Sequence, residues 1–197
     1  KNDFQHKQEQ LAGTVAIGSG ELQSSQFLTQ LLTAFQNDNP LITFTIYSGN
    51  SDNIKERIER GLLDVGLLQE PVDITKYNFV RTPFREQWGI LTRTDSELAA
   101  KDCVTPEELA SVPLIMPERE NIQNELLNWF GPYAENLHIT ATGNLLYNLA
   151  SLARSSGSCV LTLNLDCKYE GLCFVPLSPG LESVTVLVWK KTQTFSP

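Results

Sequence analysis

The sequence has few of the residues that build catalytic and metal sites. It contains two histidines, His6 and His138, and neither an H-E-x-x-H nor a C-x-x-C motif that would hold zinc. It has no G-x-S-x-G nucleophile elbow and no P-loop, and the G-x-G-x-x-G pattern that begins at Gly18 fails at Gln23. These absences predict that the chain is not an enzyme and that it holds neither a metal ion nor another cofactor.

Basic residues and long apolar runs are also scarce. The 197 residues include 15 Lys and Arg against 23 Asp and Glu, a formal charge of −8 that would repel a nucleic-acid backbone. No apolar run approaches the roughly 18 residues that span a bilayer, and residues 1–10 lack the apolar core of a signal peptide. We therefore expect a cytoplasmic protein that contacts neither DNA nor a membrane through these residues.

The four cysteines are Cys103, Cys159, Cys167 and Cys173. Their spacing matches no small disulfide scaffold, and a chain of this length buries a core without covalent staples, so we expect reduced thiols. Cys167 precedes Lys168 and lies six residues before Cys173, which leaves a redox pair open as the alternative to a structural role.

The first half of the chain alternates between strands and helices. Strands are expected at residues 14–18, 41–47 and 64–68. The N-cap residues of the two intervening helices are expected to be Ser24 or Ser25, and Ser51 or Asp52. The apolar face of the first helix comprises Phe27, Leu28, Leu31, Leu32 and Phe35, and that of the second comprises Ile54, Ile58 and Leu62. A β-α-β-α-β order implies parallel strands with right-handed crossovers, and hence the α/β class.

A second α/β unit is expected in residues 93–161. Thr105-Pro106-Glu107-Glu108 has the pattern of a capping box with Pro at the first helical position. Two later helices have apolar faces, with Ile122, Leu126, Leu127 and Phe130 in one and Leu145, Leu149 and Leu152 in the other. Strands are expected at residues 85–92, 114–116, 137–142 and 159–161.

Two tail strands, at residues 172–175 and 184–189, are expected to return to the first sheet. The result is two lobes, residues 11–90 with 163–197 and residues 91–162, joined by crossing segments near residues 91–93 and 162–164. This arrangement leaves a cleft between the lobes.

Small polar residues occupy four turns, each directly before an expected helix, at residues 18–21, 48–52, 117–119 and 142–144. Ligands of open α/β sheets bind outside the carboxyl ends of the strands, where helix N-termini offer unpaired N–H groups. The turns therefore predict a small-ligand site formed by Ser19, Gly20, Glu21, Asn50, Ser51, Glu118, Thr142 and Asn144. For any single turn, ordinary helix capping is the alternative. Glu21 and Glu118 count against a simple anionic ligand, whereas Arg119 counts for one.

The order and spacing of several motifs resemble the effector-binding domain of LysR-type transcriptional regulators. Leu11–Gly18 is similar to the start of that domain, and Gly61–Leu67 resembles its G-x-x-D-hydrophobic-G-hydrophobic segment. Thr105–Leu109, followed by Val112–Ile115, resembles the next landmark. Residues 157–161 fall where members usually carry a Gly-x-Gly segment, although here the second glycine is replaced.

The resemblance implies an α/β, type II periplasmic-binding-protein-like fold, with two lobes of mixed sheets around a hinged cleft. The cleft would bind a small-molecule effector, such as an organic or amino acid. A winged helix-turn-helix would precede the domain, with residues 1–10 as the end of a linker helix, so that promoter DNA and RNA polymerase are contacted only through the full-length protein. The family also implies a homodimer or higher oligomer, paired through the first helix and second strand, and a further helix beginning at Ser196-Pro197.

Two other functions remain as alternatives on the same scaffold. An extracytoplasmic solute-binding protein is disfavoured by the missing leader and by cysteines without a disulfide pattern. An enzyme, such as a dehydratase acting on a small acid, would need a positioned acid–base group, and the sequence offers only unplaced carboxylates. Because a fold does not fix a function, the choice of a regulator rests on the family resemblance.

Overall fold

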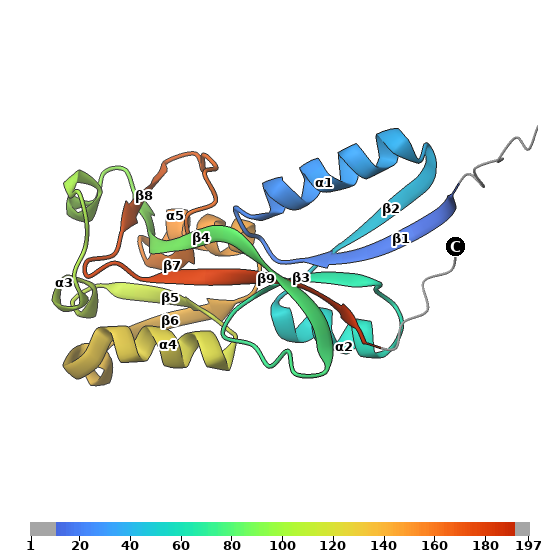
Figure 1. The fold of residues 1–197 in the computed structure, drawn as a ribbon. Helices are drawn as coiled ribbons and strands as arrows, with labels where there is room; N and C mark the ends of the chain where they lie inside the picture. Colours follow the sequence, from blue (N-terminus) through green and yellow to red (C-terminus); the bar gives the residue numbers. More distant parts are fainter. Residues whose placement is uncertain (1–10, 192–197) are drawn as a thin grey trace, which may run out of the picture.

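The computed structural model describes residues 11–191. The predictions for residues 1–10 and for Ser196-Pro197 lie outside this range. Within it, nine strands form a continuous mixed sheet, and the strand pairing divides this sheet between two lobes (Figure 1).

The first lobe contains the expected parallel unit. Strand β1 (Ala12–Ser19) lies between β2 (Leu41–Ser48) and β3 (Val65–Gln69) and pairs in parallel with both. Strand β9 (Glu182–Lys190) then pairs antiparallel with β3. Helices α1 (Ser25–Asp38) and α2 (Ser51–Glu59) lie on opposite sides of this sheet (Figure 1). The β-α-β-α-β prediction is therefore confirmed.

The second lobe is built around another parallel group. Strand β5 (Pro113–Pro117) lies between β6 (His138–Gly143) and β7 (Cys159–Leu163) and is parallel to both. Its helices are α3 (Pro106–Ala110), α4 (Glu120–Phe130) and α5 (Leu146–Ser156), with short 3-10 helices η1 (Glu97–Ala100) and η2 (Gly131–Asn136). The capping box before α3 is confirmed, because Thr105 N–H donates to Glu108 Oε2 and Glu108 N–H donates to Thr105 Oγ1.

One long strand, β4 (Tyr77–Arg93), joins the two lobes. Its residues 77–87 pair with β9, and its residues 88–93 pair with the second lobe. At the change of partner, the buried indole of Trp88 donates its N–H to Ser183 Oγ of β9 at 2.9 Å. The sequence predicted only residues 85–92 of this strand. Pro83 and a register shift between Arg81 and Arg85 break the alternation that would have revealed the first part.

The prediction that both tail strands return to the first sheet is wrong for β8 (Leu172–Pro176). This strand pairs antiparallel with residues 89–93 of β4, within the second lobe, and only β9 returns. The return to the first lobe therefore follows β8 rather than β7. β7 pairs with only one edge of β4, and the backbone N–H and C=O groups of the other edge need partners. β8 pairs with this edge and supplies them.

Several helix details differ from the sequence-based expectation. The N-cap of α2 is Asn50 rather than Ser51 or Asp52, and Leu145 occupies the N-cap position of α5. Four apolar residues that were expected to point inward are exposed: Leu31 at 47%, Phe35 at 42%, Leu62 at 48% and Leu152 at 42%. Leu127 is also partly outside, at 37%. The apolar face of each of these helices is thus wider than the part of it that packs against the sheet.

None of the helices within residues 11–191 is both long and apolar enough to cross a bilayer.

Candidate functional site

A cavity of about 110 Å³, open to solvent, lies between the two lobes. The carboxyl ends of β1, β2 and β3 reach it from the first lobe, and those of β5, β6 and β7 reach it from the second. This is where ligands of open α/β sheets bind. The first lobe contributes Gly20, Glu21, Leu22, Gly49, Asn50, Ser51 and Gln69 to the lining. The remaining lining residues are Trp88, Pro117, Glu118, Arg119, Ile122, Gly143, Asn144, Leu146, Leu149 and residues 160–163.

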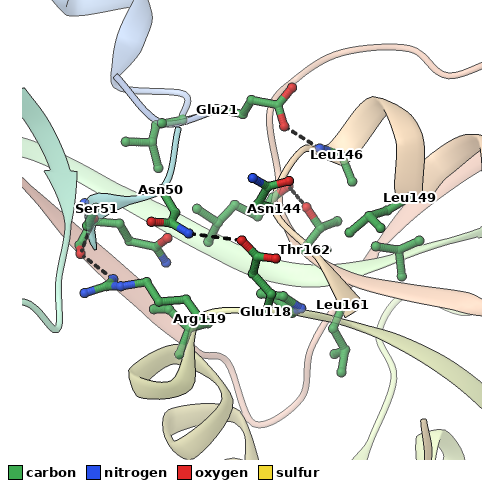
Figure 2. Close-up of a pocket in the computed structure, with 18 of the residues that line it drawn as sticks. Glu21, Asn50, Ser51, Glu118, Arg119, Asn144, Leu146, Leu149, Leu161 and Thr162 are labelled. Carbon is green, nitrogen blue, oxygen red and sulfur yellow. Dashed lines mark hydrogen bonds between the residues drawn. The ribbon is translucent and has the colours of Figure 1, made fainter. Parts of the chain in front are cut away.

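Six of the eight residues proposed from the sequence line this one cavity. They are Gly20, Glu21, Asn50, Ser51, Glu118 and Asn144, and Figure 2 shows five of them around the cavity, all but Gly20. The structure thus brings together residues from four separate turns. Their role in binding an effector stays a proposal.

Ser19 and Thr142 are not part of the cavity lining. Ser19 is the last residue of β1 and is 6% exposed, and its hydroxyl donates to the carbonyl of Gly20. Thr142 lies within β6 and pairs with Met116 of β5. β1 runs one residue farther than the expected strand at residues 14–18 and so includes Ser19. Thr142 already belonged to the expected strand at residues 137–142, and it lies one residue before the end of β6.

The sequence reasoning missed several polar and apolar lining residues. Gln69 stands at the carboxyl end of β3, and Thr162 stands near that of β7. The strand-end rule would have found both if it had been applied to all six strands that reach the cavity. The apolar walls, which include Leu22, Ile122 and Leu149, gave no comparable signal because their spacing is that of ordinary core residues.

Side chains of the protein already occupy the N-termini of α2 and α5 and the backbone segment just ahead of α1. The Glu86 carboxylate accepts hydrogen bonds from the N–H groups of Gln23 and Ser24, ahead of α1, at 3.0 and 2.9 Å. Asn50 Oδ1 accepts the N–H groups of Asp52 and Asn53 at the start of α2. Near the start of α5, Glu21 accepts the N–H of Leu146 from across the cavity.

No side chain caps α4, the fourth helix. Its N-cap residue, Arg119, instead reaches into the first lobe. Arg119 donates through Nη1 to the carbonyl of Gln69 at 3.0 Å and through Nη2 to the carbonyl of Pro71. Its Nε lies 3.2 Å from Asp52 Oδ2, and its side chain is only 4% exposed.

Arg119 therefore connects the lobes. It does not present a free positive charge to the cavity, which is what the sequence had suggested when Arg119 was counted in favour of an anionic ligand. A second contact between the lobes is the Asn50 amide, which donates to Glu118 Oε1 at 3.3 Å. With the bond from Leu146 to Glu21, three separate contacts cross the cavity (Figure 2).

The described residues offer little to a metal ion. Between residues 11 and 191, no group of three or more His, Cys, Asp or Glu side chains is placed to hold one. The cavity can instead supply amide groups, two hydroxyls and two carboxylates beside apolar walls, which is the composition of a small-molecule site.

Comparison with known proteins connects this geometry to one family. The family model described as the LysR substrate binding domain matches residues 8–197. The HTH-type transcriptional regulator YvbU of Bacillus subtilis (strain 168) is 23% identical over 137 residues, which are 70% of this chain and 44% of that protein. The match thus spans less than half the length of that relative.

Two solved structures are similar in fold. The effector binding domain of QuiR, in complex with shikimate, has a TM-score of 0.77 at 14% identity over 95% of this chain and 91% of that one. The CcmR regulatory domain of Synechocystis PCC6803, in complex with 2-PG, has a TM-score of 0.76 at 14% identity over 93% and 90%. At such identities the likeness shows the fold, a two-lobed periplasmic-binding-protein-like domain.

Proposed function

Because the chain belongs to the LysR substrate binding domain family, we propose that it is the effector-sensing domain of a LysR-type transcriptional regulator. The effector is a small molecule that binds in the cavity between the lobes. The observation that carries the proposal is this cavity, which is lined by residues that follow strands of both lobes. The similar domains of QuiR and CcmR, in complex with shikimate and 2-PG, support a ligand of small size.

The geometry suggests how binding is transmitted. A ligand that touches Asn50 and Ser51 on one side and Glu118 and Asn144 on the other contacts both lobes at once. Such a ligand favours the arrangement in which the lobes are close together. It shifts the equilibrium only by the difference between its affinities for the two arrangements.

The rest of the regulator is part of the same proposal. The HTH-type relative is longer than the segment that it shares with this chain. We propose that promoter DNA and RNA polymerase are contacted through the full-length protein, in the cytoplasm, and that this domain binds without catalysing a reaction. A solute-binding protein of a transport system is not favoured, because the relatives are transcriptional regulators.

We also propose a homodimer formed through α1 and β2. The exposed apolar side chains of these two elements include Leu31 and Phe35 of α1 and Leu41 and Ile46 of β2, and Leu41 and Ile46 are more than half exposed at 53% and 56%. Apolar side chains gathered on neighbouring elements are typical of an interaction surface.

A screen of metabolites by thermal shift tests the effector site, because a ligand that binds only the native state raises its stability by RT ln(1 + [L]/Kd). Calorimetric titration of the best compound would follow, with Asn144→Ala, Asn144→Trp and, as a control, Asn121→Ala. Asn121 is an exposed asparagine of α4 outside the cavity lining.

We expect Asn144→Ala to weaken binding about threefold to tenfold, the effect of one lost hydrogen bond. Asn144→Trp fills the cavity and should abolish binding, whereas Asn121→Ala should change nothing. Unchanged affinity in both Asn144 variants would show that the ligand binds elsewhere.

A further inference from the structure

The charged side chains that line the cavity differ in whether they are free to bind a ligand. Its lining contains three charged side chains, Glu21, Glu118 and Arg119. Arg119 is buried, faces the carboxylate of Asp52 and donates to two backbone carbonyls of the first lobe. The two carboxylates have no cation as a partner within the described residues, so the charge left to a ligand is negative.

Both carboxylates keep acceptor capacity for a ligand. Glu118 accepts one hydrogen bond through Oε1, from the neutral amide of Asn50, and Glu21 accepts one through Oε2, from the backbone N–H of Leu146. An ionised carboxylate offers about four lone-pair sites. Figure 2 shows the two groups at the border of the cavity, Glu21 on the first lobe and Glu118 on the second.

An anionic ligand finds no comparable partner. The first N–H groups of α1 already donate to the carbonyls of Leu22, Gln23 and Ser24. The N-termini of α2 and α5 already hold the side chains of Asn50 and Glu21. The N-terminus of α4 lacks a side-chain cap, but Glu118 stands immediately ahead of its N-cap. A carboxylate or phosphate placed there would meet a like charge, whereas an ammonium group would meet an opposite one.

The remaining walls of the cavity are apolar. Leu22, Ile122, Leu149 and Leu161 contribute to them, and Trp88 lies at the point where β4 passes between the lobes. A ligand therefore needs an apolar body as well as a polar group.

We propose that the effector is an amine: a molecule with a cationic ammonium group between Glu21 and Glu118 and an apolar body against the leucine walls. This inference rests on the proposed function, because it names the chemical class of the ligand for the same cavity. An ammonium that bridges the two carboxylates joins residues of opposite lobes and so favours the closed arrangement.

Three probes of nearly equal shape and different charge test the proposal: benzylamine, benzyl alcohol and benzoate. Their affinities for the 197-residue chain are measured by calorimetric titration at pH 7, with shikimate as a second anion. We expect benzylamine to bind at least tenfold more tightly than benzoate or shikimate, with benzyl alcohol in between.

Glu118→Gln and Glu21→Gln keep the side-chain shape and remove the charge. Each should weaken benzylamine about tenfold and leave benzyl alcohol unchanged. Glu120→Gln, an exposed neighbour outside the cavity lining, is the matched control and should alter neither affinity. Thermal melting of each variant verifies that it folds.

The outcomes separate this inference from the proposed function. The amine proposal is overturned if benzoate or shikimate binds as tightly as benzylamine, or if both Glu variants bind benzylamine with unchanged affinity. Either result leaves the proposed effector site intact. If none of the probes and no compound of the metabolite screen binds, the effector site itself is overturned, and the amine with it.

Discussion

Arg119 Nε lies 3.2 Å from Asp52 Oδ2, although Arg119 is the N-cap of α4 and Asp52 lies in the first turn of α2, and these helices belong to different lobes. The Arg119 side chain is 4% exposed and that of Asp52 is 58% exposed. The guanidinium is therefore buried, whereas its carboxylate partner lies at the surface. The two carbonyls that Arg119 also reaches, of Gln69 and Pro71, belong to the first lobe as well. This one side chain therefore fixes the distance between the lobes at that end of the cavity.

Arg119→Ala is expected to loosen the contact between the lobes. Loss of hydrogen bonds from a charged donor should lower the free energy of unfolding by about 1.5–3 kcal/mol, and small-angle scattering should show a larger radius of gyration. Arg154→Ala is the control, because Arg154 and its partner Glu170 are 52% and 95% exposed and an exposed pair contributes little. An unchanged radius and stability for Arg119→Ala would contradict the assigned role.

Glu86→Ala is expected to destabilise the first lobe. The carboxylate is fully buried and binds the backbone just ahead of α1 with two hydrogen bonds, so its removal leaves the N–H groups of half-buried Gln23 and buried Ser24 without a partner. We expect a loss of about 2–4 kcal/mol in urea unfolding, since each unsatisfied group costs roughly 1–3 kcal/mol. Glu182→Ala, at an exposed position of β9, should change little. Equal effects of the two variants would refute the capping role.

Glu125 provides a pH-dependent test. Burial raises the pKa of this carboxyl above its ordinary value of 4.5, and the charge of Arg119 opposes the rise only in part. The stability associated with its protonated form is fully present below the unfolded pKa and is lost as pH rises through the folded pKa. Glu125→Gln should therefore raise the melting temperature at pH 7, and the gain should shrink toward pH 4. A gain that stays constant over this range, or equals that of the exposed Glu135→Gln, would exclude this cause.

The dimer proposal is tested by charge on α1. Phe35→Glu should convert a dimer into a 22.0 kDa monomer in light scattering, because it places a carboxylate within the exposed apolar face. Leu152→Glu, on α5 and equally exposed at 42%, should leave the oligomeric state unchanged. A wild-type chain that is monomeric at high concentration would count against the proposed interface.

The cysteines should differ in their reactivity toward an alkylating reagent at pH 8. Cys103 and Cys167 are exposed, whereas burial raises the pKa of Cys159 and of Cys173. Because the thiolate is the reactive form, we expect rapid labelling of the first two and slow labelling of the others by mass spectrometry. A raised pKa at Cys173 also argues against a redox pair with Cys167. Formation of a disulfide between Cys167 and Cys173 under mild peroxide would instead support the redox pair.

Much of the cavity lining was predictable because its signals are local. A polar turn that follows an apolar strand and precedes a helix can be recognised within a few residues, and six of the eight residues chosen in this way line one cavity. Ser19 and Thr142 do not line the cavity, because Ser19 is the last residue of β1 and Thr142 lies inside β6. The end of a strand depends on hydrogen bonds to its neighbour, as from the N–H of Gly49 to the carbonyl of Ser19, and these have no signature in the sequence.

The sequence by itself determined the elements whose causes are short-range: the β-α-β-α-β order of residues 12–69 and the capping box of Thr105 and Glu108, three positions apart. Only the tertiary structure decided which charges remain available. The cap that Glu86 places ahead of α1 joins residues 62 positions apart, and the contact of Arg119 with Asp52 joins residues 67 positions apart. Periodicity and capping patterns act over one or two turns of chain, so they cannot indicate that an arginine beside a cavity is already neutralised by the opposite lobe. That neutralisation requires the two lobes to be packed together, which only the complete fold provides.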